Sequence, residues 1–214
     1  MSAKSIGILD YGAGNFGSVK RALEALSVSP VAVTNSHQLD TLSHLIFPGV
    51  GSAKQAMNEL RGRGLDAGLK DFVRSGRPLL GICVGMQVLG RYSAEGDTEC
   101  LGLIPFEVQR LDCTQPVPHM GWNSLSWQTS HAAHDRAGAG LHEHSNFYFV
   151  HSYAAVVKKE NVDQRHLLAT CEYGGISFAA LVAHKNVWGA QCHVEKSGRA
   201  GLRFLQNFLN AESI

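Results

Sequence analysis

The sequence carries little net charge and has no long hydrophobic run, and each absence argues against a class of function. Its 214 residues include 19 Lys and Arg against 18 Asp and Glu, so the formal net charge is +1, and no basic block occurs. This balance argues against a nucleic-acid partner. No apolar stretch is long enough to span a bilayer, so no membrane attachment is expected.

Cysteine pairs are also missing. The five cysteines are odd in number, scattered along the chain and never spaced as C-x-x-C; they are Cys83, Cys100, Cys113, Cys171 and Cys192. This pattern disfavours a disulfide framework and a structural zinc site. The first apolar run is too short for the core of a signal peptide. We therefore expect a soluble cytoplasmic protein whose thiols stay reduced.

The first half of the chain alternates short apolar segments with helical patterns. Strands are predicted at residues 5–9, 31–34, 45–47 and 78–83, and helices at residues 16–26, 52–60 and 66–74. Helices between successive strands imply parallel strands in an open, doubly wound sheet. Sites in such sheets form beyond the carboxyl ends of the strands, where Asn15, Val50 and Cys83 fall.

The second half differs, because its predicted strands follow one another with short connections. They lie at residues 106–111, 124–127, 147–150, 167–173, 176–183 and 187–192, followed by a helix at residues 198–209. Hairpin turns are expected at residues 174–175 and 185–186, and a polar loop at residues 129–145. No repeat or linker occurs. The sequence thus predicts one α/β domain, residues 1–214, with an open, mostly parallel central sheet, flanking helices and an antiparallel extension.

A short motif, G-I-C-V-G-M-Q at residues 81–87, points to nucleophilic chemistry. A nucleophile between glycines at a strand-to-helix turn is typical of a nucleophile elbow, here with a thiol. Glycine is needed on both sides because Cβ atoms would collide in so tight a turn. The helix N-terminus favours the thiolate of Cys83. The alternative is a merely buried cysteine at a glycine-rich turn.

A candidate base follows 110 positions later. His193 ends the last predicted strand, and in extended backbone Glu195 would point the same way. Cys83, His193 and Glu195 would then serve as nucleophile, base and orienting group. An ordinary surface His-x-Glu pair is the alternative. Gln87, one helical turn after Cys83, either meets a polar substrate or is solvated.

Two other patterns leave alternatives open. Residues 12–17 fit G-x-G-x-x-G after a strand, but the second strand is followed by Asn35 and not by the acidic residue that a dinucleotide fold uses. A zinc deaminase signature beginning at the H-x-E of residues 193–195 would need a later C-x-x-C, which does not occur. The polar loop offers possible metal ligands at His131, His134, His142, Glu143 and His144.

In order along the chain, these motifs resemble the class I glutamine amidotransferases, which share P-G-V-G at residues 48–51, the elbow and the late H-x-E. Within the class, the chain is most similar to the glutaminase subunits of imidazole glycerol phosphate synthases. That similarity rests on I-L-D-Y-G-A-G-N at residues 8–15, P-H-M-G-W-N at 118–123 and F-Y-F-V-H-S-Y at 147–153. The resemblance implies a flavodoxin-like fold.

The resemblance also implies a catalytic role for each residue. Cys83 would attack the glutamine side-chain amide to form a γ-glutamyl thioester, with His193 moving the proton and Glu195 orienting His193. An oxyanion hole would come from Val84 and the peptides around Val50 and Gly51. No metal or cofactor is implied. The residues implied to hold glutamine are Gly51, Gln87, Ser152 and Tyr153.

The resemblance further implies that the ammonia is transferred to a partner subunit. It implies a heterodimer with a (β/α)₈-barrel cyclase subunit in histidine biosynthesis. Residues at that interface and its ammonia gate would be Asn15, Met120, Trp122 and Lys196. The alternatives are a paralogous amidotransferase that feeds another synthase and a non-catalytic nucleotide-binding protein that uses the loop of residues 12–17.

The chain departs from the family at two positions. Val194 stands where the family usually has proline, so we expect the triad to form with looser His–Glu geometry. Cys192 stands where an aromatic residue is frequent, and an exposed thiol there would be open to oxidation.

Overall fold

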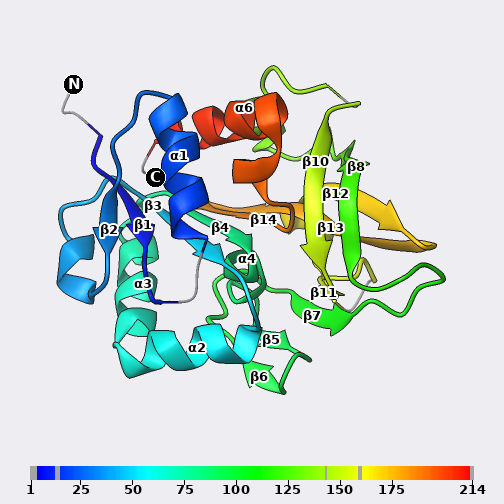
Figure 1. Cartoon of the computed structure of the whole chain (residues 1–214), viewed down its shortest axis with the longest axis horizontal. Helices are drawn as coiled ribbons and strands as arrows, with labels where there is room; N and C mark the ends of the chain where they lie inside the picture. The colour runs from blue at the N-terminus through cyan, green and yellow to red at the C-terminus, as the bar shows by residue number, and fades with distance from the viewer. Residues whose placement is uncertain (1–3, 13–14, 143, 159–160, 213–214) are drawn as a thin grey trace.

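A computed structural model describes residues 4–12, 15–142, 144–158 and 161–212. Ala13 and Gly14 of the glycine-rich hexapeptide, and Glu143 of the polar loop, lie outside the described residues. The centre of the molecule is an eight-stranded sheet in the order β2-β1-β3-β4-β14-β13-β12-β9 (Figure 1).

Four strands from the first half of the chain run parallel to one another. A fifth parallel strand, β14 (Val187–Ala190), pairs with the fourth of them in chain order. The four are β1 (Ile6–Leu9), β2 (Val31–Val33), β3 (His44–Gly49) and β4 (Leu79–Cys83). Every residue of β1, β3 and β4 is buried, as expected where both faces of a parallel sheet are covered.

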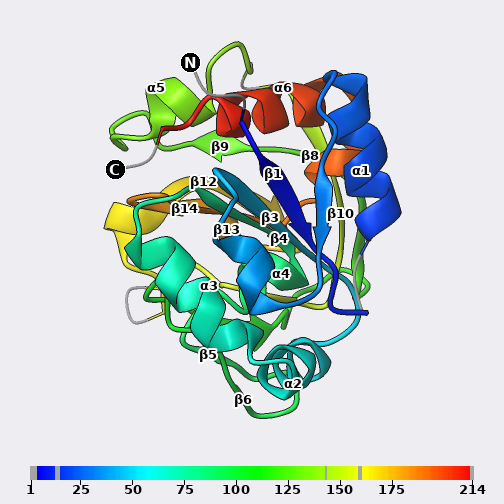
Figure 2. The same cartoon turned by 90° about the vertical axis from the view of Figure 1, so that its left-hand side faces the viewer.

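The helices provide that cover. The pair α1 (Phe16–Ala25) and α6 (Gly198–Leu209) lies on one face of the sheet, and α2 (Ala53–Gly62) and α3 (Leu65–Arg74) lie on the other (Figures 1 and 2). The predicted helices are confirmed to within one or two residues at their ends. Among the described helices, none combines the length and apolar character needed to cross a membrane.

The antiparallel extension is also confirmed. After β14 come β13 (Ile176–His184), β12 (Leu167–Tyr173) and the short β9 (Ser126–Trp127), each antiparallel to its neighbour. Both predicted hairpin turns occur, since Tyr173 pairs with Ile176 and His184 pairs with Val187. The last strand ends at Ala190, two residues earlier than predicted.

The prediction of one strand over residues 124–127 is wrong. The chain there leaves one strand, β8 (His119–Ser124), and enters another, β9, which belongs to a different sheet. β8 pairs with β10 (Asn146–His151) in a separate two-stranded ribbon. The sequence H-M-G-W-N-S of β8 is too polar to have shown a strand pattern.

Shorter elements were also missed. A helical turn, α5 (His134–Ala137), interrupts the predicted loop of residues 129–145. A small sheet orders β11 (Tyr153–Ala154), β7 (Glu107–Arg110), β5 (Tyr92–Ser93) and β6 (Thr98–Glu99). Of these, β7 confirms the strand predicted at residues 106–111, and the other three were not predicted. The helix predicted to begin after Cys83 is confirmed as the single turn α4 (Val84–Gln87). The turns that were not predicted are η1 (Ser36–Leu39), η2 (Gln164–His166) and η3 (Val194–Lys196). Strands of two residues and single helical turns are too short for a periodic signal.

Candidate active site

The backbone around Cys83 has the strained geometry of an elbow. Cys83 is the last residue of β4 and adopts φ 55° and ψ −112°, a conformation rare for residues with a side chain, before α4 begins. A Cβ atom on Gly85 would lie 1.9 Å from the carbonyl oxygen of Phe47, and one on Gly81 would lie 2.8 Å from the backbone of Gly85. The predicted need for glycine on both sides of the sulfur is therefore confirmed.

The end of β3 lies directly against this elbow. Gly49 pairs with Cys83 in the ladder, and a Cβ atom on Gly49 would come within 2.4 Å of the Gly85 nitrogen. This close approach brings the next residues, Val50 and Gly51, beside Val84 in a common pocket. The three residues predicted to form an oxyanion hole thus lie together.

His193 and Glu195 make the predicted contact by a different route. Their atoms Nδ1 and Oε1 are 2.7 Å apart, and the two side chains are 3% and 0% exposed. Residues 194–196 form the helical turn η3, so the expectation of extended backbone there is wrong. The turn brings the two side chains together, and the short distance is achieved with Val194 in the place of proline.

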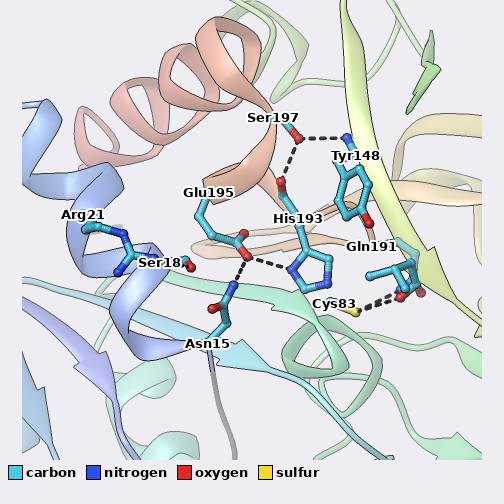
Figure 3. A network of polar contacts seen from close by, with 10 residues as sticks. Asn15, Ser18, Arg21, Cys83, Tyr148, Gln191, His193, Glu195 and Ser197 are labelled. Atoms are coloured by element: carbon cyan, nitrogen blue, oxygen red, sulfur yellow. Dashed lines mark hydrogen bonds and ion pairs between the residues drawn. The ribbon is translucent and has the colours of Figure 1, made fainter. Parts of the chain in front are cut away.

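The other side of the His193 ring faces the sulfur, as Figure 3 shows. Burial lowers the pKa of His193, but its hydrogen bonds to Cys83 and Glu195 outweigh that effect and hold the pKa well above its usual value. With Nδ1 bonded to the carboxylate, Nε2 is the nitrogen available to Cys83. A protonated imidazole therefore lies between the Cys83 sulfur and a buried carboxylate.

Main-chain contacts hold His193 against β10. Its N–H donates to the carbonyl of Tyr148 over 2.8 Å, and its carbonyl accepts from the Ser197 hydroxyl over 2.7 Å. The same hydroxyl accepts from the Tyr148 N–H over 2.9 Å (Figure 3). Ser197 was not singled out from the sequence, and nothing in its surroundings marks it.

Glu195 has a second partner from the start of α1. The Asn15 amide donates from Nδ2 to Glu195 Oε1 over 2.7 Å. Asn15 was predicted at a partner interface, and the structure gives it this contact inside the site. Gln191 is another residue that the sequence analysis missed, with Nε2 3.8 Å from the Cys83 sulfur. Its position two residues before His193 was the available signal.

A pocket of about 210 Å³ opens at the sulfur and the imidazole. It joins the predicted oxyanion and glutamine-binding residues, and its lining is Val50, Gly51, Cys83, Val84, Gln87, Glu95, Val150, His151, Ser152, Tyr153 and His193. Gln87 is only 3% exposed, so a solvated side chain is ruled out. A larger cavity of about 610 Å³ beside α6 includes none of these residues.

The predicted interface residues lie around the same site. Met120 and Trp122 on β8 are 62% and 59% exposed, and the Trp122 ring meets the Tyr148 ring edge-on at 5.9 Å. Lys196 is exposed directly after Glu195. Cys192, in contrast, is fully buried, and burial raises its pKa well above the usual value, so it stays a protonated thiol.

Metal ligands do not gather in the described part of the chain. Within it, no group of three or more His, Cys, Asp or Glu side chains is placed to hold a metal ion. His142 and His144 of the polar loop are described, whereas Glu143 between them is not.

Comparisons with known proteins agree with this geometry. The sequence profile of the family Glutamine amidotransferase class-I matches residues 7–211. The imidazole glycerol phosphate synthase subunit HisH of Nitratidesulfovibrio vulgaris strain Hildenborough is 43% identical over 211 residues, covering 95% of this chain and 94% of the relative. The HisH subunit of Pasteurella multocida is 39% identical over 208 residues, covering 96% and 98%.

Solved structures show the same fold. A crystal structure of a glutamine amidotransferase superposes with a TM-score of 0.72 at 23% identity, covering 95% of this chain and 96% of the other. The PurLQS structure from Thermotoga maritima gives a TM-score of 0.74 at 17% identity, covering 97% and 98%. The chain belongs to the class I glutamine amidotransferase family and, within it, to the group of HisH subunits.

Proposed function

We propose that this chain is the glutaminase subunit of an imidazole glycerol phosphate synthase and that it hydrolyses glutamine to glutamate and ammonia. The observation that carries the proposal is the continuous contact Cys83–His193–Glu195 at a small pocket. The identity of about 40% to HisH subunits along nearly the whole chain supports the choice of synthase.

In the first half of the reaction, the Cys83 sulfur attacks the side-chain carbonyl carbon of glutamine as a thiolate, paired with the protonated His193. The protonated His193 gives its proton from Nε2 to the leaving nitrogen, so that ammonia departs and a γ-glutamyl thioester remains. Glu195 stabilises the charged imidazole and fixes its orientation through Nδ1. The Asn15 amide donates to the same carboxylate oxygen, Oε1.

In the second half, His193 takes a proton from water, which attacks the thioester carbonyl and releases glutamate and the thiolate. Each attack places negative charge on the carbonyl oxygen of glutamine. The Val84 N–H and a peptide N–H at Val50 or Gly51 stabilise that charge as an oxyanion hole. Gly51, Gln87 and the backbone at Ser152 and Tyr153 hold the substrate, since all line the pocket.

The ammonia passes to a (β/α)₈-barrel cyclase subunit that forms a heterodimer with this chain. The surface of this chain that docks the cyclase subunit includes Asn15 and the exposed residues near the triad, Met120, Trp122 and Lys196. We place the complex in the cytoplasm, where the five free thiols would stay reduced.

Glutamine turnover by the complex with the cyclase subunit tests the proposal. Cys83→Ala should abolish glutamine hydrolysis and labelling by a glutamine-like electrophile, while synthesis from added ammonium continues. Cys113→Ala removes a thiol outside the pocket and serves as the matched control, with turnover expected to be unchanged. Normal hydrolysis by the Cys83→Ala complex would overturn the assignment.

The same preparation tests the alternatives. Activation by a different barrel protein, with no response to the cyclase, would indicate a paralogous amidotransferase. Thermal stabilisation by nucleotides, without any glutamine turnover, would indicate a binding protein that uses residues 12–17.

A further inference from the structure

Two buried histidines lie at one side of the pocket, where His151 is part of the lining and His119 is not. His119 on β8 and His151 on β10 are opposite each other in the ladder and are 2% and 6% exposed. His119 Nδ1 lies 3.2 Å from His151 Nε2, and His151 Nδ1 lies 2.9 Å from the carbonyl oxygen of Tyr153. A row of three polar groups therefore runs from β8 to the pocket lining.

The protons in this row follow from its last member. A carbonyl oxygen only accepts, so His151 carries its proton on Nδ1 and donates it to Tyr153. Burial lowers the pKa of His119 to about 4 and that of His151 to about 3, so both rings are neutral at pH 7. The remaining nitrogen of His151, Nε2, is then an acceptor, and His119 donates to it from Nδ1.

Aromatic packing fixes the direction of that donor. The His119 ring stacks on Tyr173 with ring centres 4.0 Å apart and on Phe149 at 4.9 Å. Phe178 meets both histidine rings edge-on. A ring held between stacked neighbours presents its N–H in one orientation.

The Tyr153 carbonyl links this row to the nucleophile. It also accepts from Gln87 Nε2 over 2.8 Å, and Gln87 Nε2 lies 3.1 Å from Gln191 Oε1. Gln191 Nε2 in turn approaches the Cys83 sulfur to 3.8 Å. The buried contacts thus continue from strand β8 to the reacting atom, through a residue that lines the glutamine pocket.

We propose that His119 and His151 are positioning residues that fix the Tyr153 carbonyl and the Gln87 side chain in the shape that binds glutamine. The proposal rests on the proposed glutaminase function and adds residues to it. Strand β8 also carries the exposed Met120 and Trp122. A partner that docks on these side chains would contact the strand that contains His119.

Three substitutions separate the donor from the packing of the ring. In His119→Asn, the amide nitrogen takes the place of Nδ1 and keeps the donor. His119→Gln carries the same amide one bond further out and misplaces it, whereas His119→Phe keeps a stacking ring without any donor. We expect His119→Phe and His119→Gln to raise KM for glutamine about fivefold, the effect of one lost hydrogen bond, with a smaller change in kcat. His119→Asn should remain near the wild-type KM.

The measurements are kcat and KM for glutamine in the complex with the cyclase subunit, together with the alkylation rate of Cys83 by iodoacetamide. The alkylation rate should be equal in all variants, because the proposal leaves the nucleophile intact. If His119→Phe does not fold, the comparison of His119→Asn with His119→Gln decides. Wild-type KM in His119→Gln, or equal damage in His119→Asn and His119→Gln, would overturn the positioning role. Absence of turnover in the wild-type complex would instead overturn the proposed function.

Discussion

The two halves of the molecule hold their parts of the site by different means. The parallel half holds Cys83 through the backbone, since β3 packs so closely on the elbow that Gly49 and Gly85 have no room for a Cβ atom. In the half that follows β8, His193 and Glu195 are held by separate hydrogen bonds: His193 bonds the Tyr148 carbonyl and the Ser197 hydroxyl, and Glu195 accepts from the Asn15 side chain of the first half.

This difference predicts two kinds of sensitivity. Backbone contact at the elbow cannot relax without moving β3 from β4, so changes there should be all or none. Hydrogen bonds can be removed one at a time by substitution. Substitutions around His193 should therefore give graded losses of activity in a protein that still folds.

Gly85→Ala should produce the largest effect. Its Cβ would lie 1.9 Å from the Phe47 carbonyl oxygen, a backbone atom that cannot turn away. We expect destabilisation beyond about 4 kcal/mol, with loss of folded protein measured by circular dichroism and thermal unfolding. Gly62→Ala in α2 is the control, since nothing lies within 4 Å of its Cβ, and it should be neutral or stabilising. A Gly85→Ala variant as stable as the wild type would remove the contrast between the halves.

Glu195→Gln should leave the fold intact and reduce kcat for glutamine by about 10²- to 10⁴-fold, as in other triads that lose the charged orienting group. The amide keeps the shape of the side chain but no longer stabilises the imidazolium of His193. Steady-state kinetics of the complex measures this, with circular dichroism as the check on folding. A variant with unchanged kcat would show that Glu195 does not orient the base.

The stability lost in Glu195→Gln should depend on pH. Hydrogen bonds to Cys83 and Glu195 outweigh burial and raise the pKa of His193 in the folded protein above its unfolded value. Stability from this shift is fully present below pH of about 6.5 and is lost as pH rises through the raised pKa. The difference in unfolding free energy between wild type and Glu195→Gln should therefore be larger at pH 6 than at alkaline pH. Denaturant unfolding at both pH values measures it, and a difference that grows with pH contradicts the assigned charge.

Asn15 should give an intermediate effect. Its side chain makes no capping bond to α1, so Asn15→Ala removes the contact with Glu195 and little else. We expect about tenfold slower labelling of Cys83 by a glutamine-like electrophile in the isolated chain, in line with one hydrogen bond to a charged group. Asn15→Asp has the same shape but places a second carboxylate beside Glu195, and it should be slower still. If both variants were labelled as fast as the wild type, the contact between Asn15 and Glu195 would have no role.

The same contrast explains which features were predictable from sequence. The elbow is a local motif, because its glycines, its strand and its helix are consecutive in the chain and leave a pattern at residues 81–87. The contact of His193 with Glu195 was expected from their spacing, although a helical turn makes it. In both cases the residues concerned are close in sequence.

The features that the sequence did not show depend on distant partners. Asn15 meets Glu195 across 180 positions, and His119 meets His151 only because β8 and β10 pair. Strand β8 itself has too few apolar residues to be recognised before its partner strand is known. Such side-chain contacts follow from the finished fold and leave no local pattern.

Val194→Pro should have the smallest effect and tests whether this half needs its backbone stiffened. Val194 begins the turn η3, a position that accepts proline, and the substitution gives up its N–H bond to the Cys192 carbonyl. Fixing φ stabilises a compatible site by about 0.4–1 kcal/mol, which that lost bond partly offsets. We therefore expect a slight rise in melting temperature and a nearly unchanged kcat, because the hydrogen bonds of Glu195 already set the distance to His193. Val194→Ala controls for loss of the buried side chain. A large gain in kcat from proline alone would show that the backbone limits this half as well.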